Sequence, residues 1–407
     1  MNTWITLSIA TLAYAGIAAG SWPGLRANRA TIALMGAGLL LAAGQIRFDQ
    51  IGQFLDLNTL ILLFSMMILN ANLQMSGFFR LAGGSLLRLA KTPRAFLAVE
   101  ILLSGLLSAF FLNDTICLMF TPFILNMMLT ARRNPLPYLI ALATAANIGS
   151  TATLTGNPQN MIIGVASGIA YVDFSLALLP AALLGMGGIW LVLVWLYPDE
   201  FRAEAFDPAL RRVSVYRPLL LKTLIIVAGL LAAFLAGVPV ALASFLAACA
   251  LLFTRRIRPE KMLKEIDWDL LVFFSALFIV TGSLEANGVS QWIFGLMRLG
   301  PETGPAAFAA ITVILSNLVS NVPAVLLLRP VIPTLSDPRA GWLALAAAST
   351  LAGNLTLLGS VANLIVAEIA RKRGVEMSFW EYTKAGALIT LISLVTGIGW
   401  IALFVWR

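Results

Sequence analysis

The sequence consists largely of apolar runs of about 20 residues, and this feature limits the chain to few folds. An α-helix of that length spans about 30 Å, which matches the hydrocarbon thickness of a bilayer. Only 11% of the 407 residues are charged and 60% are hydrophobic, whereas about 25% charged residues is usual in soluble domains. We therefore predict an all-α polytopic membrane protein. The first run, 2–20, follows no basic segment, so we interpret it as a retained span rather than a signal peptide.

The runs fall into continuous and interrupted ones. Eight continuous runs, each predicted to cross once, lie near 2–20, 30–46, 57–76, 175–196, 218–235, 238–254, 268–284 and 382–405. Amphipathic stretches follow two of them, at 78–91 and 289–299. Four runs are broken by Asn, Ser, Thr, Gly or Pro: the predicted re-entrant hairpins 94–130 and 304–332, and the predicted broken helices 138–169 and 342–370. The total is about ten transmembrane helices plus two re-entrant hairpins.

The order of these runs occurs twice, and so do their motifs. The aligned segments are FLNDTICLMFTPFI (111–124) with VSNVPAVLLLRPVI (319–332), and NIGSTATLTGNPQNMII (147–163) with LAGNLTLLGSVANLIV (351–366). This places Asn113 on Asn321 and, after a gap of one residue, Asn160 on Asn363. We therefore predict two repeats. They cover 1–196 and 218–407, and a cytoplasmic linker, 197–217, joins them.

Each repeat contributes five crossings, and an odd number inverts the second repeat relative to the first. Basic residues provide an independent indication of this orientation. With the N-terminus outside, all but five of the 27 Lys and Arg residues fall on the inner side; the five are Arg47, Arg298, Arg329, Arg339 and Arg407. We predict a multi-pass protein of the inner (plasma) membrane with both termini outside. The net charge of +8 follows from this bias, and nucleic acid is not an expected partner.

The composition argues against most enzyme classes. The sequence contains no histidine, which removes the commonest general base and metal ligand. It also contains no HExxH or GxSxG motif, and its two cysteines do not form a CxxC pair. We therefore expect no catalytic residues, no metal site and no cofactor.

The four broken segments predict where a solute binds. A helix broken inside lipid leaves backbone N–H and C=O groups unpaired, at several kcal/mol each unless protein, water or solute pairs them. Breaks at matching places in two repeats therefore predict one polar site near the bilayer midplane, at the repeat interface. The alternative for each break is a kink that neighbouring side chains satisfy.

Asp114 is the only acid at the centre of a long apolar run. Intramembrane acids mark ion or proton paths, and loss of water favours the protonated form, so we predict Asp114 as the proton-coupling residue. The alternative is a carboxylate that caps the second arm of its hairpin. Cys117, one turn further, is either a thiol contact for the substrate or a packing residue.

Three other charged residues lie within or beside the apolar runs. Arg329 is predicted to reach the outer interface rather than the site. Glu100 and Glu368 fall near the inner ends of their helices, where we expect them to pair with inner-face Arg or Lys.

At these motifs the sequence resembles the ion transporter superfamily, in particular its ArsB/NhaD branch of arsenite pumps, sodium/proton antiporters and related permeases. The resemblance covers essentially the whole chain and is carried by FLNDTICLMFTP, ANIGSTATLTGNPQNMI, SNLVSNVPAVLL and LAGNLTLLGSVANLIV. In that superfamily the hairpin tips and broken helices bind substrate. The positions that this implies here are Asn113, Asp114, Thr115, Gly149, Ser150, Thr151, Gly156, Asn157, Asn321, Gly353, Asn354, Gly359 and Ser360.

Two motifs depart from particular branches. The first broken helix is closer to the general permease pattern than to that of arsenite pumps. The Ser-Asn-Thr tip of dicarboxylate carriers is replaced by Leu112-Asn113-Asp114-Thr115, whose carboxylate would repel a dianion. Such a tip suits an uncharged weak acid or a cation.

The resemblance and Asp114 together imply proton-coupled efflux of arsenite or antimonite by alternating access, with a small inorganic substrate, protons and lipid as partners. Sodium/proton antiport or transport of another small anion is the alternative within the superfamily. A further alternative is the channel subunit of an ATP-driven pump, whose ATPase would be a separate chain because no Walker motif occurs here.

Overall fold

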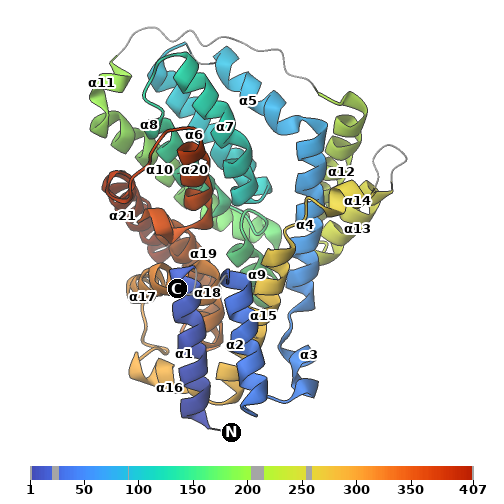
Figure 1. The fold of residues 1–407 in the computed structure, drawn as a ribbon. Coiled ribbons are helices and arrows are strands. Elements are labelled where there is room, and N and C mark those ends of the chain that lie inside the picture. The colour runs from blue at the N-terminus through green and yellow to red at the C-terminus, as the bar shows by residue number, and fades with distance from the viewer. Residues whose placement is uncertain (1, 21–26, 90, 203–214, 254–258, 406–407) are drawn as a thin grey trace.

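The computed structural model describes residues 2–20, 27–89, 91–202, 215–253 and 259–405 (Figure 1). Within these ranges the regular elements are 21 α-helices and three short 3-10 helices, and no β-strand occurs. The prediction of an all-α chain is therefore confirmed. Most of the predicted linker, 203–214, lies outside the described residues, as do the predicted inner-face residues Arg26, Arg255, Arg256 and Arg258 and the predicted outer residue Arg407.

All eight continuous apolar runs form helices, as predicted. They are α1 (Thr3–Ala19), α2 (Arg29–Ala42), α4 (Leu57–Ser76), α10 (Tyr171–Leu196), α12 (Arg217–Leu235), α13 (Val240–Leu252), α15 (Trp268–Ala286) and α21 (Phe379–Phe404). Within the described part of the chain, α4, α6 (Pro93–Phe110), α10, α12, α15 and α21 are long and apolar enough to cross a membrane, by length and composition. The helices α1, α2 and α13 are apolar but shorter.

Acidic side chains begin two corresponding helices of the two halves. Asp56 precedes α4 and accepts a hydrogen bond from the backbone N–H of Thr59 at 3.1 Å. Asp267 precedes α15 and accepts one from the backbone N–H of Leu270 at 2.9 Å. These caps pair N–H groups that the first turn of a helix leaves without partners, which explains where both helices start.

Two helical hairpins occupy the predicted re-entrant segments. The first consists of α6 (Pro93–Phe110) and α7 (Asn113–Thr130), and the second of α17 (Pro305–Val319), α18 (Asn321–Leu328) and the 3-10 helix η2 (Arg329–Thr334). In Figure 1, α6 and α7 lie in the upper part of the molecule and α17 and α18 in the lower part. The two hairpins therefore approach the middle from opposite ends, as inverted repeats require.

Each predicted broken helix is a pair of helices joined by a non-helical segment. The first pair is α8 (Leu136–Ser150) and α9 (Pro158–Ser167); the second is α19 (Pro338–Ala352) and α20 (Val361–Lys372), with the 3-10 helix η3 (Leu357–Gly359) between them. Asn157 begins α9 by accepting a hydrogen bond from the N–H of Asn160, and Ser360 begins α20 in the same way through Ala362. In each broken helix, the second of the two helices thus starts at a polar capping residue that lies at the break.

Shorter helices complete the chain. They are η1 (Phe48–Gln50), α3 (Ile51–Phe54), α5 (Phe78–Leu89), α11 (Pro198–Phe201), α14 (Pro259–Leu263) and α16 (Val289–Leu296). The amphipathic stretches predicted after α4 and α15 correspond to α5 and α16, so the order of elements is the same in both halves.

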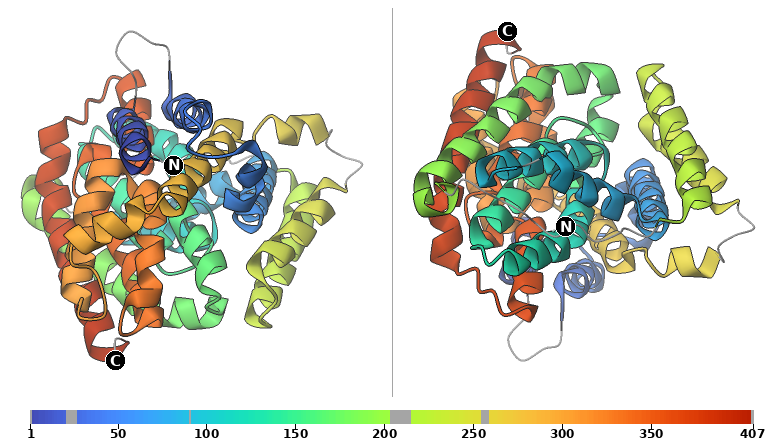
Figure 2. Two further views of the ribbon diagram at one scale, coloured as in Figure 1. Left: turned by 90° about the horizontal axis from the view of Figure 1, so that it is seen from below. Right: turned by 90° about the horizontal axis from the view of Figure 1, so that it is seen from above.

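Glycine allows the helices around the breaks to pack closely. A Cβ on Gly149 of α8 would lie 2.2 Å from the carbonyl oxygen of Gly105 on α6. A Cβ on Gly185 of α10 would lie 2.9 Å from Ile148, also on α8. Such small residues let helix backbones approach in apolar surroundings. The pair α12 and α13 packs against α4 at the edge of the molecule, as Figure 2 shows.

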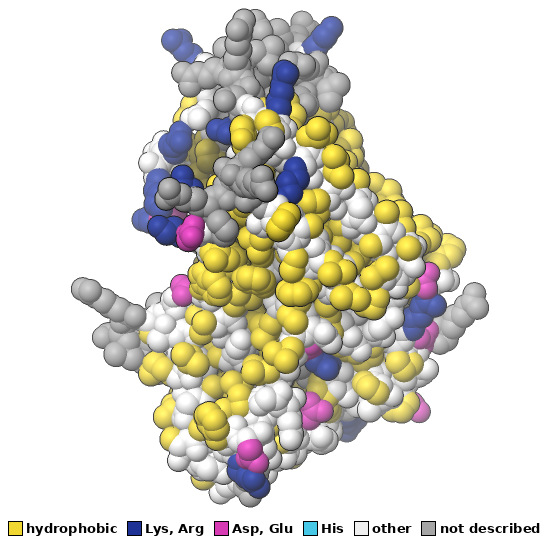
Figure 3. Space-filling model, turned by 90° about the vertical axis from the view of Figure 1, so that its right-hand side faces the viewer, with side chains coloured by type: hydrophobic (Ala, Val, Ile, Leu, Met, Phe, Trp, Pro, Cys, Tyr) yellow, Lys and Arg dark blue, Asp and Glu magenta, His cyan; other side chains and the backbone are white. Residues whose placement is uncertain are grey.

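The surface has the pattern of a membrane protein. The face in Figure 3 is largely apolar in its middle, and Lys and Arg side chains gather towards its upper end. Leu221 and Ile225 of α12 and Leu246 of α13 are among the large exposed apolar side chains. This pattern agrees with lipid around the middle and a basic inner side, while the sidedness itself stays a prediction.

Glu100 and Glu368 were both predicted to pair with Arg or Lys, and the prediction is correct for Glu368 and wrong for Glu100. Glu368 pairs with Arg371 at 2.8 Å and with Lys372 at 3.5 Å, as predicted. Glu100 pairs with no basic residue of the described ranges, because this part of α6 packs against α8 and leaves the carboxylate fully buried. Arg329 is half-exposed and lies 3.8 Å from Asp56.

Candidate functional site

The tips of both hairpins are non-helical, and an asparagine begins the helix that follows each tip, Asn113 in the first half and Asn321 in the second. The first tip turns at 111–112, and the backbone N–H of Asn113 donates to the carbonyl of Gly156 in the first broken helix, at 3.0 Å. The second tip turns at Ser320, which has a φ of 78°, a conformation that non-glycine residues rarely adopt. Such strain persists only where the surrounding structure holds it, and it is typical of ligand-binding segments.

The two broken helices are closed by equivalent asparagines. The amide nitrogen of Asn160 donates to the carbonyls of Ser150 and Thr153, at 3.1 and 2.9 Å. The amide nitrogen of Asn363 donates to those of Gly353 and Thr356, at 2.8 and 3.1 Å. These bonds satisfy carbonyls that the breaks leave without helical partners. The alignment of the two repeats matched Asn160 with Asn363. In the structure each of them donates hydrogen bonds to the backbone carbonyls of its own break.

A buried network centred on Asn147 connects the two halves. Its amide nitrogen donates to the side-chain oxygens of Asn354 and Asn363, at 2.9 and 3.2 Å. Its oxygen accepts from Asn113 at 3.0 Å and from Ser360 at 3.1 Å. Asn147 thereby joins the first hairpin tip to the second broken helix. Sequence reasoning did not select it as a site residue, although it opens the NIGSTATLTGNPQN motif.

A cavity of about 420 Å³ opens in front of this network. The predicted site residues that line it are Asn113, Asp114, Asn321 and Ser360. Further polar or charged residues line it as well, namely Asn28, Arg29, Gln159, Asp267, Asp269 and Ser320. Apolar side chains, including Phe273 and Phe274 of α15, complete the wall. Both hairpin tips and both broken helices therefore meet at one cavity.

In the described part of the chain, three carboxylates and one guanidinium line this cavity. Asp114 belongs to the first hairpin, and Asp267 and Asp269 belong to the start of α15. Arg29, at the start of α2, lines the cavity together with these carboxylates, so it is a cation that can offset part of their negative charge. Asn28 donates to Asp269 at 3.0 Å. Sequence reasoning missed these residues of α2 and α15, because their only signal was a charge or a cap at the start of a span.

The other predicted site residues lie behind the cavity wall. They are Thr115, Gly149, Ser150, Thr151, Gly156, Asn157, Gly353, Asn354 and Gly359. Several of them shape the breaks: Asn157 donates to Ser150 Oγ at 2.8 Å, and a Cβ on Gly156 would lie 2.5 Å from the Ser150 carbonyl oxygen. Thr115 accepts a hydrogen bond from Asn70 of α4 at 3.3 Å. These residues position the lining side chains rather than contacting the cavity.

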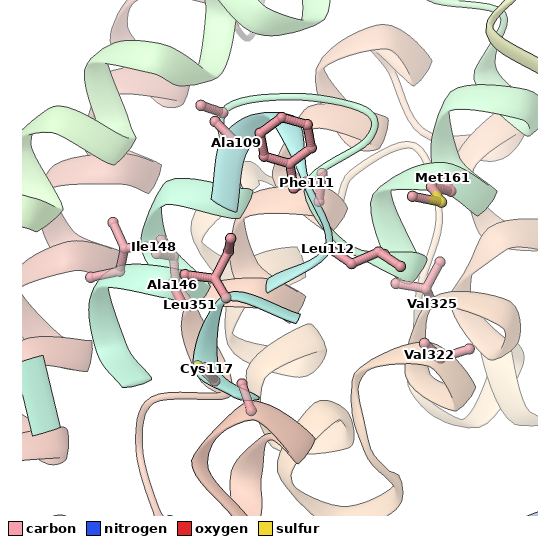
Figure 4. Close-up of a cluster of buried hydrophobic side chains, with 14 of the residues drawn as sticks. Ala109, Phe111, Leu112, Cys117, Ala146, Ile148, Met161, Val322, Val325 and Leu351 are labelled. Carbon is pink, nitrogen blue, oxygen red and sulfur yellow. The ribbon is translucent and has the colours of Figure 1, made fainter. Parts of the chain in front are cut away.

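Cys117 is fully buried and does not line the cavity. Figure 4 shows it in a cluster of buried apolar side chains around the first hairpin tip, which also includes Leu112 and Val322. The packing alternative for this thiol thus agrees with its position. Among the described residues, no group of three or more Cys, Asp or Glu is placed to hold a metal ion.

A serine hydroxyl holds the first arm of each hairpin to its surroundings, Ser316 in the second hairpin and Ser108 in the first. Ser316 donates to Asn321 Oδ1 at 2.6 Å and lies 3.1 Å from the carbonyl of Ser349. In the first half, Ser108 donates to the carbonyl of Ala146 at 2.6 Å. The contacts of Ser316 with Ser349 and of Ser108 with Ala146 each link the first arm of a hairpin to the neighbouring broken helix, so both tips are held against the breaks.

Comparison with known proteins identifies a family and several relatives that this chain resembles. A family model described as Citrate transporter matches residues 17–352. Silicon efflux transporter LSI3 of Oryza sativa subsp. japonica is 33% identical, with 93% of each chain covered. Putative transporter arsB of Dictyostelium discoideum is 25% identical over 91% of this chain and 86% of its own.

A solved structure shares the fold. The YdaH transporter of Alcanivorax borkumensis superposes with a TM-score of 0.63 at 16% sequence identity, covering 99% of this chain and 98% of that one. The prediction of a polytopic membrane protein is therefore confirmed, and so is the resemblance to the ion transporter superfamily. The chain belongs to the citrate transporter family, a family of membrane transporters within that superfamily.

Proposed function

We propose that this protein is a proton-coupled secondary transporter that exports a small uncharged oxyacid, with arsenite or antimonite as the first substrates to test. The main support is the position of Asp114, which lines the same cavity as Asn113 and as Asn321 of the other half. An acid at a solute cavity inside a membrane protein is a natural site for a coupling proton.

The charges around the cavity favour an uncharged solute or a cation. Among the described residues that line the cavity, the charged ones are Asp114, Asp267, Asp269 and Arg29. This excess of negative charge opposes a dianion or trianion such as citrate, despite the name of the family. Arsenous acid and its antimony counterpart are uncharged at neutral pH, so the carboxylates do not repel them.

The polar side chains of the cavity suit hydroxyl groups. The side-chain oxygen of Asn113 is buried and has no hydrogen-bond partner in the described part of the chain. It is an acceptor beside the proton-carrying group, and a solute O–H can pair with it. Ser360 and Gln159, on the opposite wall, add a hydroxyl and an amide. A solute with several O–H groups would therefore replace hydration bonds with protein bonds on more than one side.

The names of two relatives support the same chemical class. One relative is named a silicon efflux transporter and another a putative transporter arsB. Silicic acid and arsenous acid are both small, uncharged and rich in hydroxyl groups. Silicic acid is therefore the second substrate to test, and sodium/proton antiport remains the alternative for the same Asp114.

The transport cycle in this proposal uses the inverted halves. The repeats 1–196 and 218–407 would move relative to each other and open the cavity to one side at a time. Asp114 would be protonated on the outer side and release its proton on the inner side, while the solute moves outward. The placement of the protein in the inner membrane, with both termini outside, belongs to the same proposal.

Uptake into inside-out membrane vesicles tests this function. Vesicles with an acidic interior should accumulate arsenite, antimonite or silicic acid, and an uncoupler should abolish the accumulation. Asp114→Asn should abolish it as well. Asp49→Asn, at an exposed residue that pairs with Arg47 away from the cavity, should not.

Two outcomes would contradict the proposal. Sodium-dependent proton movement without uptake of any of the three solutes would establish the antiporter alternative. Uptake that is independent of the proton gradient but requires ATP and a separate chain would establish the channel-subunit alternative.

A further inference from the structure

Glu100 of α6 is a buried acid that the central cavity does not use. Its side chain has no exposed surface, and neither carboxylate oxygen has a hydrogen-bond partner among the described residues. Ser104, four residues further on, is also fully buried, and its hydroxyl has no partner either. Residues four apart lie on the same helix face, so α6 presents two unsatisfied polar groups side by side.

The surroundings of Glu100 determine its charge. No described residue donates a hydrogen bond to the Glu100 carboxylate. A buried carboxylate that lacks such donors costs far more when it is ionised than a typical hydrogen bond contributes, whereas the neutral acid is tolerated. The pocket therefore holds the protonated acid. Since a protonated side chain can donate, the unpaired Ser104 oxygen is a suitable neighbour for its O–H.

A chain of polar groups leads from Glu100 towards the surface. Tyr138 of α8 lies beside this part of α6, because its ring packs on Phe96, one turn before Glu100, with 5.5 Å between centroids. The Tyr138 hydroxyl donates to Glu200 of α11 at 3.0 Å. Glu200 pairs with Arg133, between α7 and α8, at 3.3 Å, and its side chain is 10% exposed.

We propose that Glu100 is a second proton-binding site, separate from the cavity, which exchanges its proton with the solvent beside α11 through Tyr138 and Glu200. In the outward step, Tyr138 passes its hydroxyl proton to a carboxylate oxygen of Glu200 and takes the proton of Glu100. Glu100 is left as a carboxylate, and Glu200 releases the proton to water. The reverse steps reload Glu100, so no other reactant is needed.

This site goes beyond the proposed function. It requires neither a particular solute nor a coupling role for Asp114, because Glu100 does not line the cavity. If Glu100 binds no exchangeable proton, the proposed transport function is unaffected. If the protein does not export these solutes, the proposed proton-binding site at Glu100 is unaffected.

Carbodiimide labelling tests the protonated state on the unaltered protein. N,N′-dicyclohexylcarbodiimide reacts with protonated carboxyl groups in apolar surroundings, and peptide mass spectrometry locates the adduct. We expect an adduct on Glu100 and none on Glu368, which is exposed and paired with Arg371 and Lys372. Labelling of other carboxyl groups without Glu100 would overturn the proposal.

Infrared spectroscopy after a pH jump tests the exchange route. Glu100→Gln keeps the shape and neutrality of the side chain and should remove one carboxylic-acid C=O band without lowering the thermal unfolding midpoint. Tyr138→Phe keeps the ring but removes the relay hydroxyl, and should slow the change of that band at least tenfold. If Glu100→Gln leaves every carboxylic-acid band in place, the proposed site is wrong. If Tyr138→Phe leaves the rate of change of the Glu100 band unaltered, the proposed route is wrong.

Discussion

Asn147 of the first half donates a hydrogen bond to Asn354 of the second half, with 2.9 Å between Nδ2 and Oδ1. Both side chains are almost fully buried. The bond joins two broken helices that are more than 200 residues apart in the sequence, so the polar network is shared between the halves rather than built within either.

Removal of Asn147 should weaken the protein at this junction. Asn147→Ala leaves Asn113, Asn363 and Ser360 without the partner that each has now. Buried polar groups left unpaired cost about 1–3 kcal/mol each, so we expect a lower thermal unfolding midpoint in detergent and loss of transport. Asn58→Ala, at an exposed asparagine of α4, is the control and should leave both unchanged. An unaltered midpoint for Asn147→Ala would contradict the central role of this residue.

The equivalence of the two breaks can be measured separately. Asn160→Ala and Asn363→Ala each remove one amide that pairs two or more backbone carbonyls. Because the two side chains do the same work, we expect similar losses of thermal stability, on the order of 2 kcal/mol each. The measurement is the unfolding midpoint of each variant under the same conditions. A large loss in one half with none in the other would show that the repeats are not equivalent here.

Close helix packing at the first break predicts a strong effect of one methyl group. In Gly149→Ala the new Cβ would overlap the backbone of Gly105, so α6 and α8 must separate. We expect poor yield of folded protein and transport reduced at least tenfold, because overpacking typically costs about 1–3 kcal/mol and the hairpin tip would also move. Gly187→Ala on α10, where no atom lies within 4 Å of the new Cβ, should behave like the parental protein. Equal behaviour of the two variants would argue against this packing account.

The charges that face Asp114 predict opposite shifts in the pH dependence of transport. Arg29→Gln removes the cation that favours ionised Asp114, so the pH of half-maximal transport should rise by about one unit. Asp267→Asn removes the opposing anion and should lower that pH. Proteoliposome assays over a range of pH provide the measurement, with Asp49→Asn as an unshifted control. Shifts in the same direction for both cavity variants would exclude this electrostatic role.

Sequence patterns predicted the elements of the site well. Apolar runs, their polar breaks and the matching of Asn113 to Asn321 and Asn160 to Asn363 located both hairpins and both broken helices. These features are local, since a helix of a given length and a break of a given composition depend on neighbouring residues only. The same reasoning singled out Asp114, which lines the cavity.

Tertiary structure alone decided which polar residues meet. Arg29 and Asp267 stand at the starts of helices far apart in the sequence, yet they line the cavity with Asp114, whereas Ser150 and Asn354 of the breaks turn into the protein behind it. The state of Glu100 was equally unpredictable, because its position near a helix end suggested a basic partner. The physical reason is that hydropathy identifies which segments leave water, but only the packing of segments against each other decides which buried groups find partners.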